Sequence, residues 1–272
     1  MIPAPFDYVR AGSVDEAISL LGSREDAKLL AGGHSLLPAM KLRVARPSTL
    51  VDIGRIGDLS YAREDGDRVA VGALTRHHDV GNAEALQELC PIVAHAAGQI
   101  GDPQVRHMGT IGGSVAHGDP AGDLPAVLLA LDAEFVAQGP NGTRTIAATE
   151  FFTSLFETAL APDEVLTEIR IPKANAGWSF MKFQRRAQDW AVVGVSAVRA
   201  NGGVHVGLTN MGLTPLRAAG VEEAVGGGAD PASAAARADE GTAPPDDAFG
   251  SAEYRRQLVK VLVRRALEEA LA

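Results

Sequence analysis

The segment TIGGSVAHGDPAGDLPA, from Thr110 to Ala126, says most about the fold of this chain. Its glycine pair, Gly112-Gly113, lies between two hydroxyl side chains, Thr110 and Ser114. Consecutive glycines permit positive φ angles without steric cost, so their N–H groups can turn toward one point. Backbone of this shape binds anions, above all phosphate. The segment therefore predicts a phosphate-binding loop, with a plain tight turn as the alternative for a single pair.

A segment of the same kind lies earlier in the chain, AGGHSLLPAMKLR, from Ala31 to Arg43. Residues 31–43 are called the first glycine segment below, and residues 110–126 the second. In it, Gly32-Gly33 is followed by two further donors, His34 and Ser35. Two separate loops suit a diphosphate better than a monophosphate. The usual nucleotide fingerprints, G-x-G-x-x-G after a strand and G-x-x-x-x-G-K-[ST], are missing from the sequence, which argues against a Rossmann or P-loop protein.

The bulk composition narrows the classes of function. The 272 residues allow one large domain or two modest ones. A formal charge of −9 disfavours a general binder of nucleic acid or of anionic membranes. Cys90 is the only cysteine, so neither an internal disulfide nor a cysteine-ligated cluster can form on this chain. The start resembles no signal peptide, and no apolar run approaches the ~20 residues of a membrane span, so we expect a cytoplasmic protein without membrane insertion.

Caps, turns and periodicity predict a mixed α+β chain. The capping box Ser13-x-x-Glu16 predicts a short helix that ends near Gly22. Pro140-Asn141-Gly142 predicts a hairpin. Further helices are expected at 91–100 and 126–131, and strands at 28–31, 51–53, 69–71, 134–138, 144–147, 165–171, 178–183, 192–198 and 204–208.

The C-terminal part contains two further features. Residues 226–250 are rich in Gly, Ala, Asp and Pro, and this composition predicts a surface excursion. Ser251 is then expected to cap a last helix. The residues expected to share its apolar face are Tyr254, Leu258, Val261, Leu262 and Leu267.

Several polar residues outside the two glycine segments are weaker candidates. His77 and His78 are neighbours on a predicted loop, and a metal site there is disfavoured. Asp119 is expected to be a turn residue, and Arg185-Arg186 a solvated pair. The motifs G-x-S-x-G, H-E-x-x-H and C-x-x-C do not occur in the sequence, so hydrolase and zinc-enzyme functions have no support.

The two glycine segments resemble those of the FAD-binding middle subunits of molybdenum hydroxylases, the carbon monoxide dehydrogenase and xanthine dehydrogenase family. That family's second segment is usually TIGGN-x-A-x-A-D-P-x-x-D-x-P. Here Ser114 replaces the Asn, and His34 in the first segment replaces a frequent Gln. The resemblance covers essentially the whole chain. It continues through GALTRHHDV (72–80), GDPQVRHMGT (101–110), DEVLTEIRIP (163–172), KFQRRAQDWAVVGVSA (182–197) and GSAEYRRQLVKVLVRRAL (250–267).

The resemblance implies an α+β fold with two domains. Residues 1–175 would form an FAD-binding domain of the vanillyl-alcohol oxidase and p-cresol methylhydroxylase type, in two subdomains divided near residue 57. Residues 176–272 would form a smaller α+β C-terminal domain.

The resemblance also implies which residues contact FAD. The two glycine segments would meet the diphosphate, and Asp123 would hydrogen-bond the ribityl or ribose region. Leu166 and Lys182 would line the flavin pocket, with Ile100 and Trp190 near the isoalloxazine ring. Trp190 stands where the family has Tyr, which keeps the stacking face and alters the polar group. The expected cofactor-binding set is Ala31, Gly32, Gly33, His34, Ser35, Leu36, Ile100, Thr110, Ile111, Gly112, Gly113, Ser114, Asp123, Leu166, Lys182 and Trp190.

The implied function is electron transfer, with no catalytic residue or metal ligand on this chain. Non-covalently bound FAD would pass electrons from iron–sulfur clusters to an external acceptor. The molybdenum-pterin centre would belong to a large partner subunit and the clusters to a small one, and the resemblance implies a dimer of heterotrimers. Two alternatives stay open, a self-contained flavin oxidoreductase of the same fold and a scaffold subunit without flavin.

Overall fold

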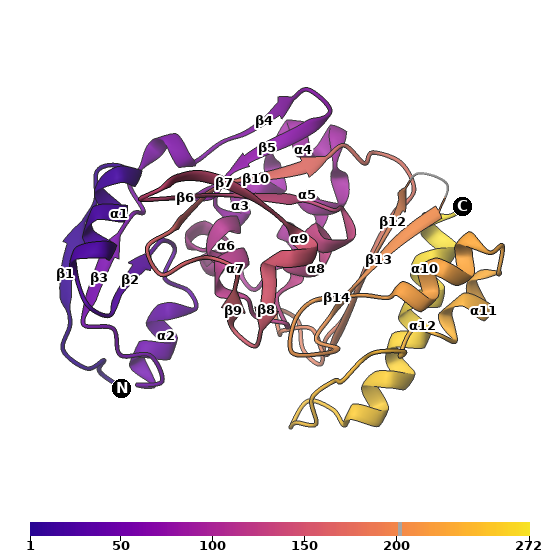
Figure 1. Ribbon diagram of the computed structural model, residues 1–272. Coiled ribbons are helices and arrows are strands. Elements are labelled where there is room, and N and C mark those ends of the chain that lie inside the picture. Colours follow the sequence, from indigo (N-terminus) through magenta and orange to yellow (C-terminus); the bar gives the residue numbers. More distant parts are fainter. Residues whose placement is uncertain (201–202) are drawn as a thin grey trace.

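The N-terminal part of the chain is a small parallel sheet with two helices beside it. The structure is a computed structural model that describes residues 1–200 and 203–272, and Figure 1 shows this part in indigo. The strand order is β1-β3-β2, with both outer strands parallel to β3. Its elements are β1 (Asp7–Arg10), α1 (Val14–Ser23), β2 (Ala27–Leu30), α2 (Leu36–Lys41), β3 (Thr49–Asp52) and the 3₁₀ turn η1 (Gly57–Leu59).

The predicted capping box at the start of α1 is confirmed. The Ser13 hydroxyl accepts a hydrogen bond from the Glu16 N–H at 3.1 Å. The Glu16 carboxylate accepts one in return from the Gly12 N–H at 2.7 Å, one residue before the position expected for a capping box. Local sequence therefore fixes where this helix begins.

The central part is an antiparallel sheet covered by short helices. The strand order is β4-β5-β10-β6-β7. The hairpin predicted at Pro140-Asn141-Gly142 is confirmed, because Gly139 pairs with Gly142 across the turn between β6 and β7. The strands are β4 (Ala62–Asp65), β5 (Arg68–Gly72), β6 (Glu134–Gly139), β7 (Gly142–Ala147) and β10 (Val165–Pro172), with a separate pair β8 (Phe152–Ser154) and β9 (Glu157–Thr158). The helices are α3 (His77–Asn82), α4 (Glu84–Leu89), α5 (Pro91–Gly98), α6 (Pro103–Met108), α7 (Ile111–His117), α8 (Asp123–Ala130) and α9 (Ala148–Phe151).

The C-terminal part is a four-stranded antiparallel sheet with a helix layer on each face (Figure 1). Alternate residues of β12 point to opposite faces. Val193 and Val195 join the core under α12, whereas Val198 joins the central core on the side of α8. A methyl group at Gly207 would lie 2.2 Å from the Ala126 carbonyl oxygen, so α8 rests directly on β13. The elements are β11 (Trp178–Phe183), β12 (Val193–Ala200), β13 (Gly203–Thr209), β14 (Leu216–Arg217), α10 (Ala219–Gly226), α11 (Pro231–Ala235) and α12 (Ala252–Ala270).

Two segments predicted as loops are helical. His77 and His78 begin α3, and residues 111–117 form α7. In α7 the Thr110 hydroxyl accepts a hydrogen bond from the Gly113 N–H at 3.1 Å, so Thr110 is an N-cap. The glycine content of this segment led to the prediction of a loop. Gly112 and Gly113 lie in the first turn of α7, where low helix propensity is tolerated when a cap is present.

Two predictions for the C-terminal part were partly wrong. The 226–250 segment contains α11, and its Ala234, Ala235 and Ala238 are buried in the core. Ser251 does cap α12, but Tyr254 and Val261 of the predicted apolar face are exposed. The buried stripe starts one residue later, at Arg255. It consists of Arg255, Val259, Leu262, Val263, Ala266, Leu267 and Ala270. Because the buried stripe begins with an arginine, the apolar pattern of the sequence did not show which face of the helix is buried.

None of the helices in 1–200 and 203–272 is both long and apolar enough to cross a bilayer.

Candidate functional site

The structure places the first glycine segment against the backbone that leads directly into the second. A methyl group at Gly32 would lie 2.1 Å from the Met108 carbonyl oxygen and 2.8 Å from the Gly109 Cα. Nearby, the His34 ring nitrogen Nε2 is 3.2 Å from the Gln104 carbonyl oxygen. Only glycine allows two backbones to approach this closely. Gly32 therefore joins the end of β2 to the segment that leads into α7.

The first segment offers a run of free backbone donors. Within the described residues, no acceptor is hydrogen-bonded to the N–H groups of residues 33–36. Gly33 has a φ of +75°, which turns the chain between β2 and α2. Ser35, at the N-cap position of α2, makes no side-chain cap bond. Successive free N–H groups on a turning backbone form an anion-binding concavity. This observation fits the predicted diphosphate site.

The second segment differs from the first. The expectation that its glycines adopt positive φ and leave their N–H groups free was wrong. Only Gly33, among the four glycines of the two pairs, has a positive φ. The N–H groups of residues 111–114 are all bonded within the protein. They donate to the Thr75 carbonyl at 3.0 Å, the Ala73 carbonyl at 2.9 Å, the Thr110 hydroxyl at 3.1 Å and the Thr110 carbonyl at 3.0 Å. These N–H groups are therefore bonded within the start of α7 or to the Ala73–Thr75 backbone, and they are not free donors.

The glycines of the second segment serve close packing instead. A methyl group at Gly112 would lie 2.5 Å from both the Cβ and the carbonyl oxygen of Ala73. At Gly113 the methyl would meet nothing within 4 Å except the Thr110 hydroxyl at 2.8 Å. The remaining space around Gly113 is open to an approaching ligand, and Ser114 beside it is half-buried.

Asp123 and Lys182 form a buried ion pair between the central and C-terminal parts. The Lys182 Nζ lies 2.7 Å from Asp123 Oδ2, and their side chains are 2% and 7% exposed. Lys182 also donates to the Gln99 carbonyl at 3.2 Å. Burial raises the pKa of Asp123, and the Lys182 ammonium opposes that rise. The sequence predicted both residues for the site but not that they pair.

One oxygen of this pair is available to a ligand. Asp123 Oδ1 is buried and has no hydrogen-bond partner in the described residues. A buried acceptor without a partner costs free energy, and a ligand hydroxyl would remove that cost. The position fits the expected hydrogen bond to a ribityl or ribose hydroxyl.

His77 is a site neighbour whose environment was not predicted. It is buried beneath Gly109, where a methyl group would lie 2.8 Å from its Cδ2, and its Nδ1 has no partner in the described part of the chain. Burial, with the nearby His34 and Arg106, lowers the pKa of His77 to about 4. The imidazole is therefore neutral at neutral pH. Its sequence neighbours gave no sign of this, since Gly109 comes from another segment.

Four other predicted residues differ in burial. Ile111 and Leu166 are buried in the central core. Ile100 is half-buried beside Gln99, and its carbonyl accepts a hydrogen bond from Arg106 at 3.0 Å. Trp190 is 60% exposed on the segment between β11 and β12.

No metal-binding group of three or more His, Cys, Asp or Glu side chains occurs in 1–200 and 203–272.

A turning backbone with free N–H groups, close to the start of α7, and a buried acid–lysine pair belong to an α+β protein, and they fit the expected site for a diphosphate cofactor. Comparison with known families makes this specific. Residues 4–174 match the family described as "FAD binding domain in molybdopterin dehydrogenase". Residues 178–270 match the "CO dehydrogenase flavoprotein C-terminal domain". The chain belongs to this family of molybdopterin dehydrogenase flavoproteins, and the expected α+β fold and family resemblance are confirmed.

Individual relatives support the same assignment over the full length. The carbon monoxide dehydrogenase medium chain of Hydrogenophaga pseudoflava is 44% identical, over 100% of this chain and 99% of the relative. The 6-hydroxypseudooxynicotine dehydrogenase complex subunit alpha of Paenarthrobacter nicotinovorans is 38% identical, over 100% and 96%. A solved structure of the Hydrogenophaga pseudoflava enzyme, which lacks the Mo-pyranopterin moiety of its cofactor, has a TM-score of 0.95 over 100% of this chain and 99% of that one.

Proposed function

We propose that this chain is the FAD-carrying electron-transfer subunit of a molybdenum hydroxylase. The free N–H groups of residues 33–36, which follow the close contact of Gly32 with Met108 and Gly109, carry the proposal. In a chain of an FAD-binding family, such donors fit the diphosphate of FAD. Bound FAD supplies the chemistry, because a flavin takes up electrons one at a time and releases two together.

The residues of the site divide the work of binding. Residues 33–36 would donate their N–H groups to the diphosphate, while Thr110 and Ser114 would offer hydroxyls from the second segment. Asp123 Oδ1 would accept a hydrogen bond from a ribityl or ribose hydroxyl, and Lys182 keeps that carboxylate in place. Ile100, Leu166 and Trp190 would border the flavin ring.

The domain division and the complex are part of the same proposal. Residues 1–175 would act as the FAD-binding domain, divided near residue 57, and 176–272 as the C-terminal domain. The relatives named above are a medium chain and a subunit of a dehydrogenase complex. We infer that a large molybdenum-cofactor subunit and a small iron–sulfur subunit bind this chain, as a dimer of heterotrimers. The cytoplasmic location stays a prediction.

The single cysteine supports this dependence on partners. Cys90 is buried, and burial raises the pKa of its thiol to about 12. Iron–sulfur clusters require cysteine thiolates, typically four for each cluster. The relay of electrons to the flavin must therefore come from another chain.

The test begins with the purified chain and its flavin. Flavin released by heat should be FAD, at one per chain, and substrates of hydroxylases should not bleach the flavin band without partner subunits. With the large and small subunits added, substrate should bleach it. FMN in the native protein would contradict the cofactor assignment, and a colourless complex would favour the scaffold alternative. Rapid bleaching of the lone chain by an organic substrate would favour a self-contained oxidoreductase.

A further inference from the structure

The segment between β11 and β12, residues 184–191, forms a closed loop that we call the Trp190 loop. The Val192 N–H donates to the Phe183 carbonyl at 2.8 Å and closes its base. Gln188 has a φ of +73°, a left-handed conformation uncommon for residues other than glycine. Trp190 is 60% exposed, whereas Ala191 after it is 2% exposed. The loop thus presents an indole outward from a buried base.

Residues at or next to both ends of the Trp190 loop are tied to residues 120–123, which end at the start of α8. Just before the loop, Lys182 of β11 pairs with Asp123 at 2.7 Å. At its end, the Asn210 side-chain amide donates to the Ala191 carbonyl at 2.9 Å. The Asn210 backbone N–H donates to the Pro120 carbonyl at 2.8 Å. Pro120 and Asp123 belong to the second glycine segment, so the loop lies beside that segment.

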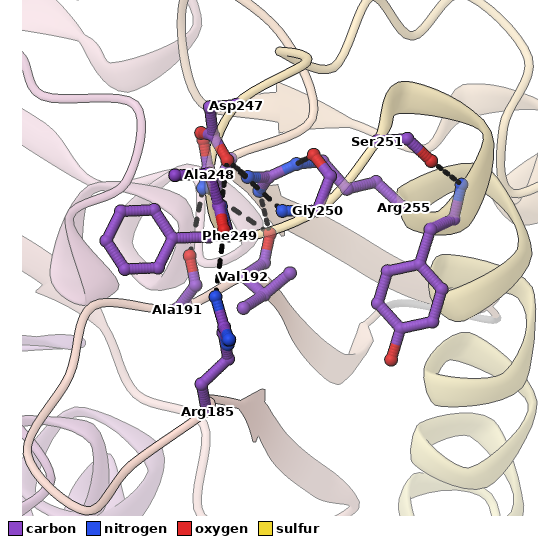
Figure 2. A network of polar contacts seen from close by, with 11 residues as sticks. Arg185, Ala191, Val192, Asp247, Ala248, Phe249, Gly250, Ser251 and Arg255 are labelled. Carbon is purple, nitrogen blue, oxygen red and sulfur yellow. Dashed lines mark hydrogen bonds and ion pairs between the residues drawn. The ribbon is translucent and has the colours of Figure 1, made fainter.

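A buried arginine on α12 also fixes the base of the loop. Arg255, on α12, is fully buried and donates to the Val192 carbonyl (Figure 2). The same guanidinium contacts Asp247 Oδ1 at 2.7 Å and the Gly250 carbonyl at 3.4 Å. Val192 O also accepts from Asn210 at 3.4 Å. Side chains from two separate elements therefore converge on one carbonyl.

The network also ties the loop to the turn before α12. The Asp247 carboxylate accepts hydrogen bonds from the Phe249 and Gly250 N–H groups at 2.8 and 3.2 Å. Arg185, within the Trp190 loop, donates to the Ala248 carbonyl at 2.8 Å, as Figure 2 shows. A planar guanidinium reaches several acceptors in fixed directions, which an ammonium cannot do.

We propose that Arg255 is a positioning residue, which with Asn210 holds the Trp190 loop against the second glycine segment and so presents the Trp190 indole to the flavin. This inference rests on the proposed flavin site. The arginine would act through the loop, since its guanidinium is bonded to Val192, Gly250 and Asp247. A purely structural arginine would affect stability alone, whereas a positioning arginine also sets how rigidly the indole is held and how strongly it meets the flavin.

The test uses the full chain with Trp178→Phe, which leaves Trp190 as the only tryptophan. In this background we expect Arg255→Gln to lower the fluorescence anisotropy of Trp190 and raise its quenching by acrylamide in the FAD-free protein. With FAD bound, quenching of Trp190 emission by the flavin should be lost, while FAD stoichiometry is kept. Arg255→Lys should recover part of both signals. Arg264→Gln is the matched control, because Arg264 is an exposed arginine on the same helix, paired with Glu268.

Each outcome decides the inference. Unchanged anisotropy and unchanged flavin quenching in Arg255→Gln would overturn it. If that variant does not fold, Asp247→Asn removes the charged partner and should shift both signals in the same direction by less. An Asp247→Asn protein identical to the parent would likewise overturn the inference. Failure of the parent chain to bind FAD would contradict the proposed function, while the anisotropy of the FAD-free protein still tests the fixation of the loop by itself.

Discussion

In the first glycine segment the N–H groups of residues 33–36 have no acceptor within the described residues, whereas in the second the N–H groups of 111–114 are all bonded inside the protein. The Gly-Gly pair therefore has a different structural role in each segment. Gly33 supplies a positive φ and leaves donors free. Gly112 allows close packing against Ala73, and the Gly112 N–H donates a hydrogen bond to the Ala73 carbonyl. A glycine pair predicts an unusual backbone but not whether that backbone faces a ligand.

The second segment also has a support that the first lacks. The C-terminal part reaches it through Lys182, which pairs with Asp123, and through Asn210, which bonds Pro120. The first segment contacts the central part where Gly32 meets Met108 and Gly109 and where His34 meets Gln104. We therefore expect substitutions to separate a stability role from a ligand role, and the predictions run from the largest effect on stability to the smallest.

Lys182→Met should give the largest loss. It leaves Asp123 buried without its cation, and breaking a buried pair in this way typically costs roughly 3–5 kcal/mol. Urea unfolding of the FAD-free chain measures the loss. The double variant Lys182→Met/Asp123→Leu should recover a large part of it, because no unpaired charge then remains. A loss well under 1 kcal/mol in the single variant would show that the pair does not hold the second segment.

Gly32→Ala should come next. Its new methyl group would meet the Met108 carbonyl at 2.1 Å, so the backbone of one segment must move. Overpacking of this kind costs up to about 3 kcal/mol. The matched control is Gly22→Ala in α1, where a methyl group meets nothing within 4 Å and helix propensity favours alanine. Equal stability of the two variants would mean that the segments do not abut in solution.

The titration of His77 should give a pH-dependent effect of intermediate size. Its pKa falls from 6.5 in the unfolded chain to about 4 in the fold, so the unfolded state binds the proton more strongly. The contribution of His77 to stability is intact above pH 6.5 and is lost as the pH falls toward 4. At pH 5 the loss should be about 2 kcal/mol. Unfolding free energies of the parent and His77→Gln, compared at pH 7 and pH 5, isolate this contribution; parallel pH profiles would refute it.

Gly113→Val should change stability least and FAD binding most. A Cβ at this position meets only the Thr110 hydroxyl, so we expect the folded state to lose no more than about 1 kcal/mol. The branched side chain would, however, fill the open space beside Ser114 that a ligand needs. Titration with FAD should show loss of binding by a folded protein. FAD affinity equal to that of the parent would mean that the second segment is only a structural helix start.

The sequence by itself determined the local elements of this protein. The caps at Ser13 and Ser251, the proline at the start of α5 and the hairpin at 140–142 all lie where local rules place them. Such signals depend on residues within one turn of each other, so they can be read without knowing the fold. The glycine segments also identified the family, because their residues are specific in combination.

Only the tertiary structure decided how the site is built. The Lys182–Asp123 pair, the burial of His77 under Gly109 and the convergence of Asn210 and Arg255 on Val192 all join distant segments. Likewise, the N–H groups of 111–114 are consumed partly by Ala73 and Thr75, outside their own segment. Periodicity and motifs describe neighbours along the chain. Which donors stay free and which charges are buried depends instead on neighbours in space, and these are fixed only when the sheets and helices pack.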